Sequence, residues 1–576
     1  MAGQECRKWM ILVATIWIQA FTGTNFDFSA YSSELKVVLG ISQVQLNYLA
    51  TASDIGKALG WSSGLALMYM PLWSVMFVAA FMGLFGYGIQ WLLILHLLSL
   101  PYFVVFFLCL LAGCSITWFN TVCFVLCIKN FPSNRPLALA LTVSFNGVSA
   151  ALYNLAAVSI NPSSTQIYLL LNAFIPLITS IAALVPILRQ PPINPLPSDA
   201  IKHEQLIFAV LNFLALITGL YLLFFHSTDS STARVIFAGA ILLLVLPWGI
   251  PGIIYARDWF QHKIFSSFTL QGSGFLLVDA DDLEFHKEFL SRENSQINVM
   301  SYGVNCDRPT LTPFLTRIIG TGGASDQGCC GKIIGIDQLF MLGEEHKAGL
   351  LVRRLDFWLY YLAYFCGGTI GLVYSNNLGQ IAQSLGHSSM TSTLITLYSS
   401  FSFFGRLLSA APDFIRLKLY FARTGWLAIA LVPTPIAFFL VAASGNEAAL
   451  QAGTALIGLS SGFIFAAAVS ITSELFGPNS VGVNHNILIT NIPVGSLVYG
   501  FLAALIYDNN AAGKATFSVQ MMTDSVVCMG RKCYFSTFLW WGCLSLLGLV
   551  SSVLLFLRTR PAYERFEQNR TANLLD

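Results

Sequence analysis

The sequence predicts an all-helical membrane protein made of two similar six-helix bundles with two extra helices between them. Of its 576 residues, 56% are apolar and only 10% are charged, and the mean hydropathy is +0.69. Soluble domains carry about 25% charged residues, so this composition indicates a chain that crosses a bilayer many times. Apolar runs of about 20 residues satisfy their backbone polar groups in lipid only as helices.

Fourteen apolar segments are long enough to span the bilayer. They cover residues 9–30, 43–69, 72–95, 102–129, 137–160, 166–188, 204–226, 233–255, 355–378, 389–411, 424–443, 449–473, 482–507 and 535–557. This pattern divides the chain into five parts: an amino-terminal bundle (1–190), two inserted helices (191–256), a hydrophilic loop (257–353), a carboxy-terminal bundle (354–558) and a tail (559–576).

The distribution of basic residues predicts the orientation of the chain. Of 30 Lys and Arg residues, two lie inside spans and five lie in connections on one side of the membrane, namely Lys36, Arg234, Lys514, Arg531 and Lys532. All the others lie on the opposite side, which the positive-inside rule assigns to the cytosol. We therefore expect a multi-pass protein with both termini and the long loop in the cytosol. The sequence does not distinguish the plasma membrane from an internal one.

The two bundles repeat each other in sequence. Gly56-Lys57 matches Gly405-Arg406, an offset of 349 residues (405 minus 56), and residues 147–153 match residues 493–499. Because both bundles begin in the cytosol, the repeat is parallel, about an axis along the membrane normal. Six plus six helices with this symmetry are the major facilitator architecture, in which cargo binds near the midplane between the halves.

Five short motifs carry a family resemblance: residues 7–9, 24–31, 46–57, 343–346 and 354–358. They resemble the plant nodulin-like family, which includes proteins called nuclear fusion defective four-like. The resemblance covers nearly the whole chain and implies a facilitator fold related to the oxalate/formate antiporters and the monocarboxylate transporters. The cargo of most family members is unassigned, so the resemblance does not name a substrate.

Two basic residues, Lys57 and Arg406, lie inside predicted spans. A charge at bilayer depth costs about 2.5–3.5 kcal/mol and normally faces a bundle interior or a water-filled path. Each residue belongs to a polar stripe on one helix face. The stripes comprise Asn47, Thr51, Asp54 and Lys57 on one helix, and Ser399, Ser402, Arg406, Ser409 and Asp413 on the other. We expect both stripes to line an aqueous cavity.

Arg406 is the leading candidate for cargo binding, because no carboxylate lies one turn away and a guanidinium can hold a carboxylate through two hydrogen bonds. The resemblance implies the same role, since an Arg in the equivalent span binds the carboxylate in the related families. The oxalate transporters also have a Lys in the penultimate span, which this chain lacks. Lys57 would supply that second charge, and a monocarboxylate or zwitterion fits at least as well as a dicarboxylate. The other expected cargo contacts are Asn25, Asn376, Asn377, Ser402, Tyr153 and Tyr499.

Asp54 is the preferred candidate for proton coupling, because a carboxylate at membrane depth beside a lysine can bind and release a proton when its surroundings rearrange. The alternative is that Asp54 and Lys57 form a structural ion pair. Asp27 and His485 are weaker candidates, expected near the membrane surfaces. Two residues at the cytosolic ends of spans, Asp413 and Glu474, are candidate gate residues.

The sequence around Asp413 resembles a facilitator motif whose acidic residue locks the outward-open state. Cys528 and Cys533 flank a four-residue turn in a far-side loop, where a disulfide is expected if that compartment is oxidising.

These features predict a secondary active transporter for a small organic anion or zwitterion, with or without a coupled proton. Two alternatives remain: a non-transporting sensor or scaffold acting through the cytosolic loop, and an organic-cation carrier centred on Asp54 and Glu474. The sequence has no hydrolytic or redox centre, zinc-ligand spacing or complete phosphate loop. We therefore expect no enzyme activity, cofactor, metal or nucleic-acid partner.

Overall fold

The computed structural model describes residues 2–260, 339 and 341–572, except residues 133, 163, 189–197, 226–228, 416–420, 478–479 and 516–527. Most of the predicted cytosolic loop lies outside the described residues. The chain divides into two units, residues 1–6 with 249–333, and residues 7–248 with 334–576. Apart from residues 1–6, both predicted bundles lie in the second unit, which contains the site described below.

The amino-terminal half forms helices throughout its predicted spans. They are α1 Ala2–Thr22, α2 Phe28–Leu39, α3 Gln43–Ala58, α4 Trp61–Tyr69, α5 Leu72–Ile94, α6 Tyr102–Asn130, α7 Arg135–Asn146, α8 Ser149–Ile160 and α9 Gln166–Leu188. The inserted segment forms α10 Ser198–Phe224, α11 Ser230–Val245 and the short turn η1 Leu246–Trp248, followed by α12 Gly249–Phe260.

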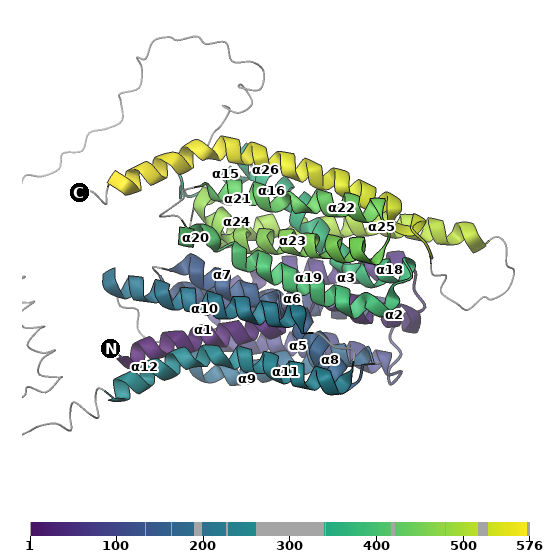
Figure 1. Ribbon diagram of the computed structural model, residues 1–576, viewed down its shortest axis with the longest axis horizontal. Coiled ribbons are helices and arrows are strands. Elements are labelled where there is room, and N and C mark those ends of the chain that lie inside the picture. Colours follow the sequence, from purple (N-terminus) through teal and green to yellow (C-terminus); the bar gives the residue numbers. More distant parts are fainter. Residues whose placement is uncertain are drawn as a thin grey trace, which may run out of the picture. The chain divides into compact units, whose positions relative to one another are not determined.

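The carboxy-terminal half is helical in the same way, and its helices run alongside one another in Figure 1. They are α15 Ala348–Leu351, α16 Leu355–Tyr364, a π-helical turn η3 Phe365–Thr369, α17 Ile370–Asn376, α18 Leu378–Ser384, η4 Ser388–Met390, α19 Thr391–Leu408, α20 Ala411–Ile415, α21 Arg423–Leu431, α22 Pro433–Ala443, α23 Glu447–Phe476, α24 Val481–Ile489, α25 Asn491–Ala515 and α26 Lys532–Ala572.

Twelve helical stretches of the described chain are long and apolar enough to cross a membrane, and each coincides with a predicted span. The first two predicted spans are not among them. One corresponds to α1, which begins with the charged residues Glu5, Arg7 and Lys8, and the other is divided into α3 and α4. The all-helical fold is therefore confirmed, whereas the count of fourteen spans remains a prediction.

The sequence repeat corresponds to a repeat in helix packing. Helix α3 crosses α6 in the first half, and α19 crosses α23 in the second. Each crossing has one glycine on each helix: Gly56 with Gly113, and Gly405 with Gly462. At all four positions an added Cβ atom would lie 1.8–2.1 Å from a backbone oxygen of the facing helix. The backbones therefore touch, and the two crossings place Lys57 and Arg406 in equivalent positions.

Replacing Gly113 or Gly462 by Ala should push each helix pair apart. Overpacking of this kind costs about 1–3 kcal/mol, so we expect a lower melting temperature of the purified protein in detergent. Gly88→Ala is the matched control, because its Cβ would meet only the Ala173 side chain, at 3.8 Å. Equal melting temperatures for the three variants would contradict the proposed backbone contact.

Candidate functional site

A cavity of about 410 Å³ lies between the two halves, in the size range of small-molecule sites. The amino-terminal half contributes residues of α3, α4, α6 and α7, and the other half contributes residues of α16, α17, α19, α23, α24 and α25. The cavity extends to Ile128 and Val481, near the helix ends that the orientation prediction assigns to the cytosol. Lys57 and Arg406, the two cations of the repeat, both line it.

At the opposite end of the helices the two halves are joined by hydrogen bonds, some between neutral groups and some to the carboxylate of Asp508 of α25, which accepts from the backbone of Gln43 and Val44. Asn47 Nδ2 donates to the Gly500 carbonyl at 3.1 Å, and Asn154 Nδ2 donates to Thr396 Oγ1 at 2.8 Å. A third bond, 3.0 Å long, connects Gln380 of α18 with Ser32 of α2. The structure is therefore closed at the predicted outer end and hollow toward the predicted cytosolic end.

Arg406 is buried in the cavity wall, with only 4% of its surface exposed. Its guanidinium carbon lies 5.3 Å from the ring centre of Phe26 and 5.7 Å from that of Phe465. Nη1 donates to the Val143 carbonyl at 3.2 Å and to Asn146 Oδ1 at 3.3 Å, while the buried Nε has no acceptor. In the described part of the chain, no carboxylate lies within ion-pair distance of this guanidinium.

The surroundings of Arg406 compensate only part of its charge. Cation–π contacts with desolvated rings contribute up to about 2 kcal/mol, and the two oxygens bonded to Nη1 are neutral. A buried charge without an opposite charge remains costly by several kcal/mol. A guanidinium in this state favours the binding of an anion that enters the cavity.

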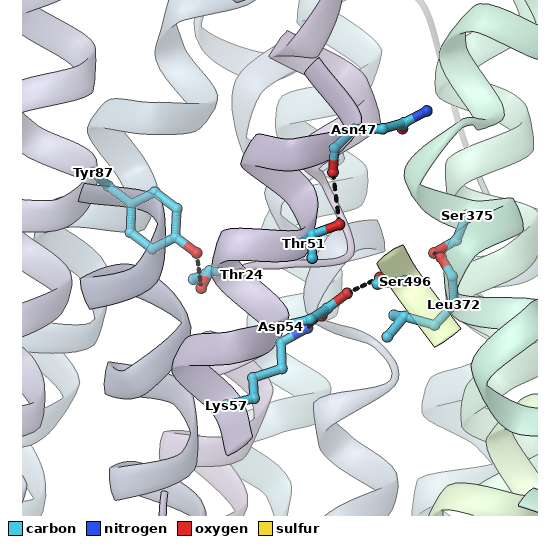
Figure 2. A network of polar contacts seen from close by, with 9 residues as sticks. All are labelled: Thr24, Asn47, Thr51, Asp54, Lys57, Tyr87, Leu372, Ser375 and Ser496. Atoms are coloured by element: carbon cyan, nitrogen blue, oxygen red, sulfur yellow. Dashed lines mark hydrogen bonds and ion pairs between the residues drawn. The ribbon is translucent and has the colours of Figure 1, made fainter. Parts of the chain in front are cut away.

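Lys57 differs from Arg406, because its charge is already paired. Its Nζ lies 2.6 Å from Asp54 Oδ1, one turn earlier on α3. The second carboxylate oxygen of Asp54 accepts a hydrogen bond from Ser496 of α25, and Figure 2 shows this contact between the halves. The Asp54–Lys57 pair is thus close to neutral and holds α3 against the other bundle.

Local sequence fixes the position of this pair. Gly40 ends α2 in the left-handed conformation (φ 61°), and Ser42 with Gln45 forms a capping box that starts α3. Along α3, Thr51 donates to the Asn47 carbonyl at 2.9 Å (Figure 2). The predicted polar stripe faces α25, because Asn47 bonds Gly500 and Asp54 bonds Ser496. Only Lys57, at the last turn of the stripe, reaches the main cavity.

The other predicted cargo contacts divide into two groups. Asn25 lines the main cavity, and Asn25 and Asn376 line a second, small pocket of about 20 Å³ beside it. Four residues are buried away from both pockets: Asn377, Ser402, Tyr153 and Tyr499.

Each of these four residues makes contacts inside the protein that account for its buried position. Tyr153 donates to the Phe21 carbonyl at 2.7 Å, and the Tyr499 hydroxyl contacts Cys366 Sγ at 3.8 Å. The amide of Asn377 bonds its own helix, and the backbone of Ser402 contacts α23 at the glycine crossing.

Asp27 lies deeper than the sequence predicts, whereas His485 lies one turn from Val481, near the predicted cytosolic end of α24. Asp27 is fully buried, because the helical path continues through α2 to Leu39 instead of ending near residue 30, and its carboxylate accepts from Asn172 Nδ2 at 2.9 and 3.1 Å. His485 lines the main cavity, and its Nδ1 has no hydrogen-bond partner.

The candidate gate residues form one cluster in the carboxy-terminal half. Arg423 pairs with Asp413 at 2.7 Å and with Glu474 at 2.9 Å, and the Tyr563 hydroxyl donates to Glu474 at 2.7 Å. These contacts join α20, α21, α23 and α26 of a single bundle. Separately, a disulfide joins Cys528, which precedes α26, to Cys533, which lies in the first turn of α26.

Several cavity residues are absent from the sequence-based site. The most informative are Asn146, Asn120, Asn486, Tyr364, Phe26 and Phe465. A signal existed for Asn146, which directly precedes the repeated segment 147–153 and the break between α7 and α8. The aromatic residues carry no such signal, because this chain has 77 Phe, Tyr and Trp residues (45, 20 and 12).

The helix arrangement and central cavity define a major facilitator fold. The crystal structure of a peptide transporter, POT, matches with a TM-score of 0.51 at 12% identity, covering 96% of this chain and 95% of that one.

Sequence comparison gives the family. Residues 8–252 match the model of the Nodulin-like family, and residues 339–565 match that of the NFD4 C-terminal domain. Protein NUCLEAR FUSION DEFECTIVE 4 of Arabidopsis thaliana is 57% identical over 568 residues, or 98% of this chain and 91% of that protein. The chain therefore belongs to the nodulin-like NFD4 family, as predicted. Probable transporter MCH1 of Yarrowia lipolytica is 30% identical over 193 residues, covering 31% of this chain and 38% of that protein.

Breaking the Asp54–Lys57 pair from one side should be more damaging than removing it. Asp54→Asn or Lys57→Met leaves one uncompensated buried group, which typically costs about 3–5 kcal/mol. The double variant leaves none, so we expect its melting temperature to lie above that of either single variant. A double variant whose destabilisation equals the sum of the single ones would show that the two charges do not interact.

Proposed function

We propose that this protein is a secondary active transporter that moves a small carboxylate-bearing anion or zwitterion by alternating access. The observation that carries the proposal is Arg406, a buried cation in the wall of a cavity between two bundles, with no carboxylate partner in the described chain. A cargo carboxylate would supply the missing charge through charge-assisted hydrogen bonds.

The charges in the cavity support a singly charged carboxylate. Lys57 is neutralised by Asp54 at 2.6 Å, so among the described lining residues Arg406 contributes the one uncompensated positive charge. Beside it lie the neutral polar groups of Asn25, His485 and Asn486. These groups suit a hydroxyl, oxo or amino substituent, so the proposed cargo is a monocarboxylate or zwitterion.

The closed outer end and the hollow cytosolic end correspond to an inward-facing state. Reaching the opposite state requires the hydrogen bonds between the halves to break, including the one from Ser496 to Asp54. We place both termini and the long loop in the cytosol, in agreement with the basic residues. Helices α10 and α11 would be two extra spans in contact with lipid, because apolar side chains such as Leu206 and Phe213 are exposed on α10.

The organic-cation alternative has less support. Asp54 is paired with Lys57, and Glu474 is paired with Arg423 and does not line the cavity. A scaffold acting through the cytosolic loop would not require an uncompensated cation in a central cavity. We therefore retain anion or zwitterion transport as the proposed function.

Asp27 is the carboxylate best placed to carry a coupled proton. It is fully buried, and Asn172 is its hydrogen-bond donor among side chains. The titratable groups that face it belong to Tyr31 of α2, Tyr87 of α5, Tyr153 of α8 and Tyr168 of α9. None of these is a cation, so an ionised Asp27 would have no counter-ion among the groups that face it.

A small pocket between the neighbours of Asp27 and the main cavity supports this proposal. The small pocket of about 20 Å³ has room for one water molecule. It is lined by Tyr31 and Tyr87, which face Asp27, and by Asn25 and Lys57, which also line the main cavity. Asp54 is less suited to this role, because it already has a cationic partner, Lys57, at 2.6 Å, whereas the titratable groups that face Asp27 include no cation.

Replacing Arg406 tests the cargo site. A thermal-shift screen of the purified protein against carboxylates, amino acids and organic cations first identifies a ligand, since a ligand that prefers the folded state raises its stability. Arg406→Gln should lower affinity for that ligand, and its uptake into proteoliposomes, by about 10–100-fold, the value of a hydrogen bond to a charged group. Arg406→Lys should recover only part of the loss.

Arg560→Gln is the control, because Arg560 is exposed and lies outside the cavity. Wild-type uptake by Arg406→Gln would refute the proposal, as would a screen in which only organic cations stabilise the protein.

Replacing Asp27 tests the coupling. Asp27→Asn mimics a permanently protonated side chain, so exchange of labelled for unlabelled cargo should persist while accumulation driven by an imposed pH gradient is lost. Asp54→Asn should not separate the two activities in this way. Accumulation by Asp27→Asn at the wild-type level would exclude Asp27 as the proton carrier.

A further inference from the structure

Arg406 also connects the two halves of the protein. It lies on α19, whereas both oxygens that it binds, those of Val143 and Asn146, lie on α7 of the other half. The Val143 carbonyl is available because the Gly147 N–H bonds the Ser144 carbonyl instead, where α7 ends. The end of α7 therefore supplies a ready-made acceptor pair for the guanidinium.

The position of Asn146 is closely fixed. Ser399 Oγ of α19 donates to the Gly147 carbonyl at 2.5 Å, and an added Cβ on Gly147 would lie 2.8 Å from the Phe403 backbone. The Asn146 side chain lines the main cavity, and its Nδ2 has no hydrogen-bond partner. Asn146 therefore offers its amide oxygen to Arg406 while the rest of the amide has no polar partner.

A carboxylate in the cavity and the amide oxygen of Asn146 compete for the same guanidinium. A hydrogen bond to an ionised acceptor is roughly twice as strong as one to a neutral acceptor, so the carboxylate displaces the amide. We propose that Asn146 occupies the anion subsite of the empty transporter and that cargo, by displacing it, removes one of the two bonds that hold α7 to Arg406. This inference rests on the proposed function.

Asn146 is then a positioning residue with two effects. It lowers the affinity for cargo, because a carboxylate must first break the Asn146–Arg406 bond. It also couples binding to movement, because that bond joins the two halves. An aspartate at this position would act as a permanent counter-ion and exclude the cargo.

The contact can be tested by chemical labelling of the full-length protein in detergent. Phenylglyoxal modifies guanidinium groups, and peptide mapping reports the rate at Arg406. We expect Asn146→Ala to raise this rate by about 2–10-fold, the factor for one neutral hydrogen bond, and Asn146→Asp to lower it. Asn130→Ala is the matched control, because this amide bonds the Leu126 carbonyl of its own helix and lies outside the cavity lining; its rate should equal the wild-type rate.

Acetate serves as the anion probe in the second arm. The acetate concentration that halves labelling should fall by about 2–10-fold in Asn146→Ala, and acetate should not protect Asn146→Asp. Equal rates for Asn146→Ala, Asn130→Ala and wild type without acetate would overturn the inference, as would faster labelling of Asn146→Asp. Changed rates without any protection by acetate would support the Asn146 contact and count against the proposed anion site instead. Because the two Asn146 variants are predicted to differ in opposite directions, either one that folds suffices.

Discussion

Backbone contact at the paired glycines is the constraint on which the site depends. Gly56 with Gly113, and Gly405 with Gly462, let two helices of each half touch without intervening side chains. Lys57 and Arg406 each follow one of these glycines directly, so the crossings carry both cations to the same cavity. A bulkier residue would change the helix spacing and, with it, the distance between the two charges.

The two halves use their equivalent cations differently. In the first half, a carboxylate one helical turn away neutralises the lysine and binds a serine of the opposite bundle. In the second half, Ser402 stands one turn before Arg406, and its hydroxyl makes no hydrogen bond. The two equivalent positions of the repeat therefore hold one structural ion pair and one guanidinium without a carboxylate partner among the described residues.

The helices, the repeat and the two buried cations could be predicted from the sequence, because apolar length and the cost of a buried charge are local properties of the chain. Contacts between the halves could not be predicted, since residues such as Asp54 and Ser496 meet only through folding. The match between Tyr153 and Tyr499 in the repeat was also a poor guide to the cavity lining. Both tyrosines are buried and bonded within their own halves, to Phe21 and Cys366. Asp27 was placed too near a surface because the helical path continues past the last strongly apolar residues.

The seal at the outer end has a consequence for how the protein changes state. Charged groups meet there, since Asp508 of α25 interacts with Lys36 of α2. The other bonds join amides, hydroxyls and carbonyls, such as Asn154 with Thr396 and Gln380 with Ser32. Water replaces such bonds when they separate, so each contributes only about 0.5–1.5 kcal/mol net, and salt screens neutral groups very little. In the proposed cycle the neutral part of the seal should therefore depend little on ionic strength, whereas salt weakens the attraction between Lys36 and Asp508.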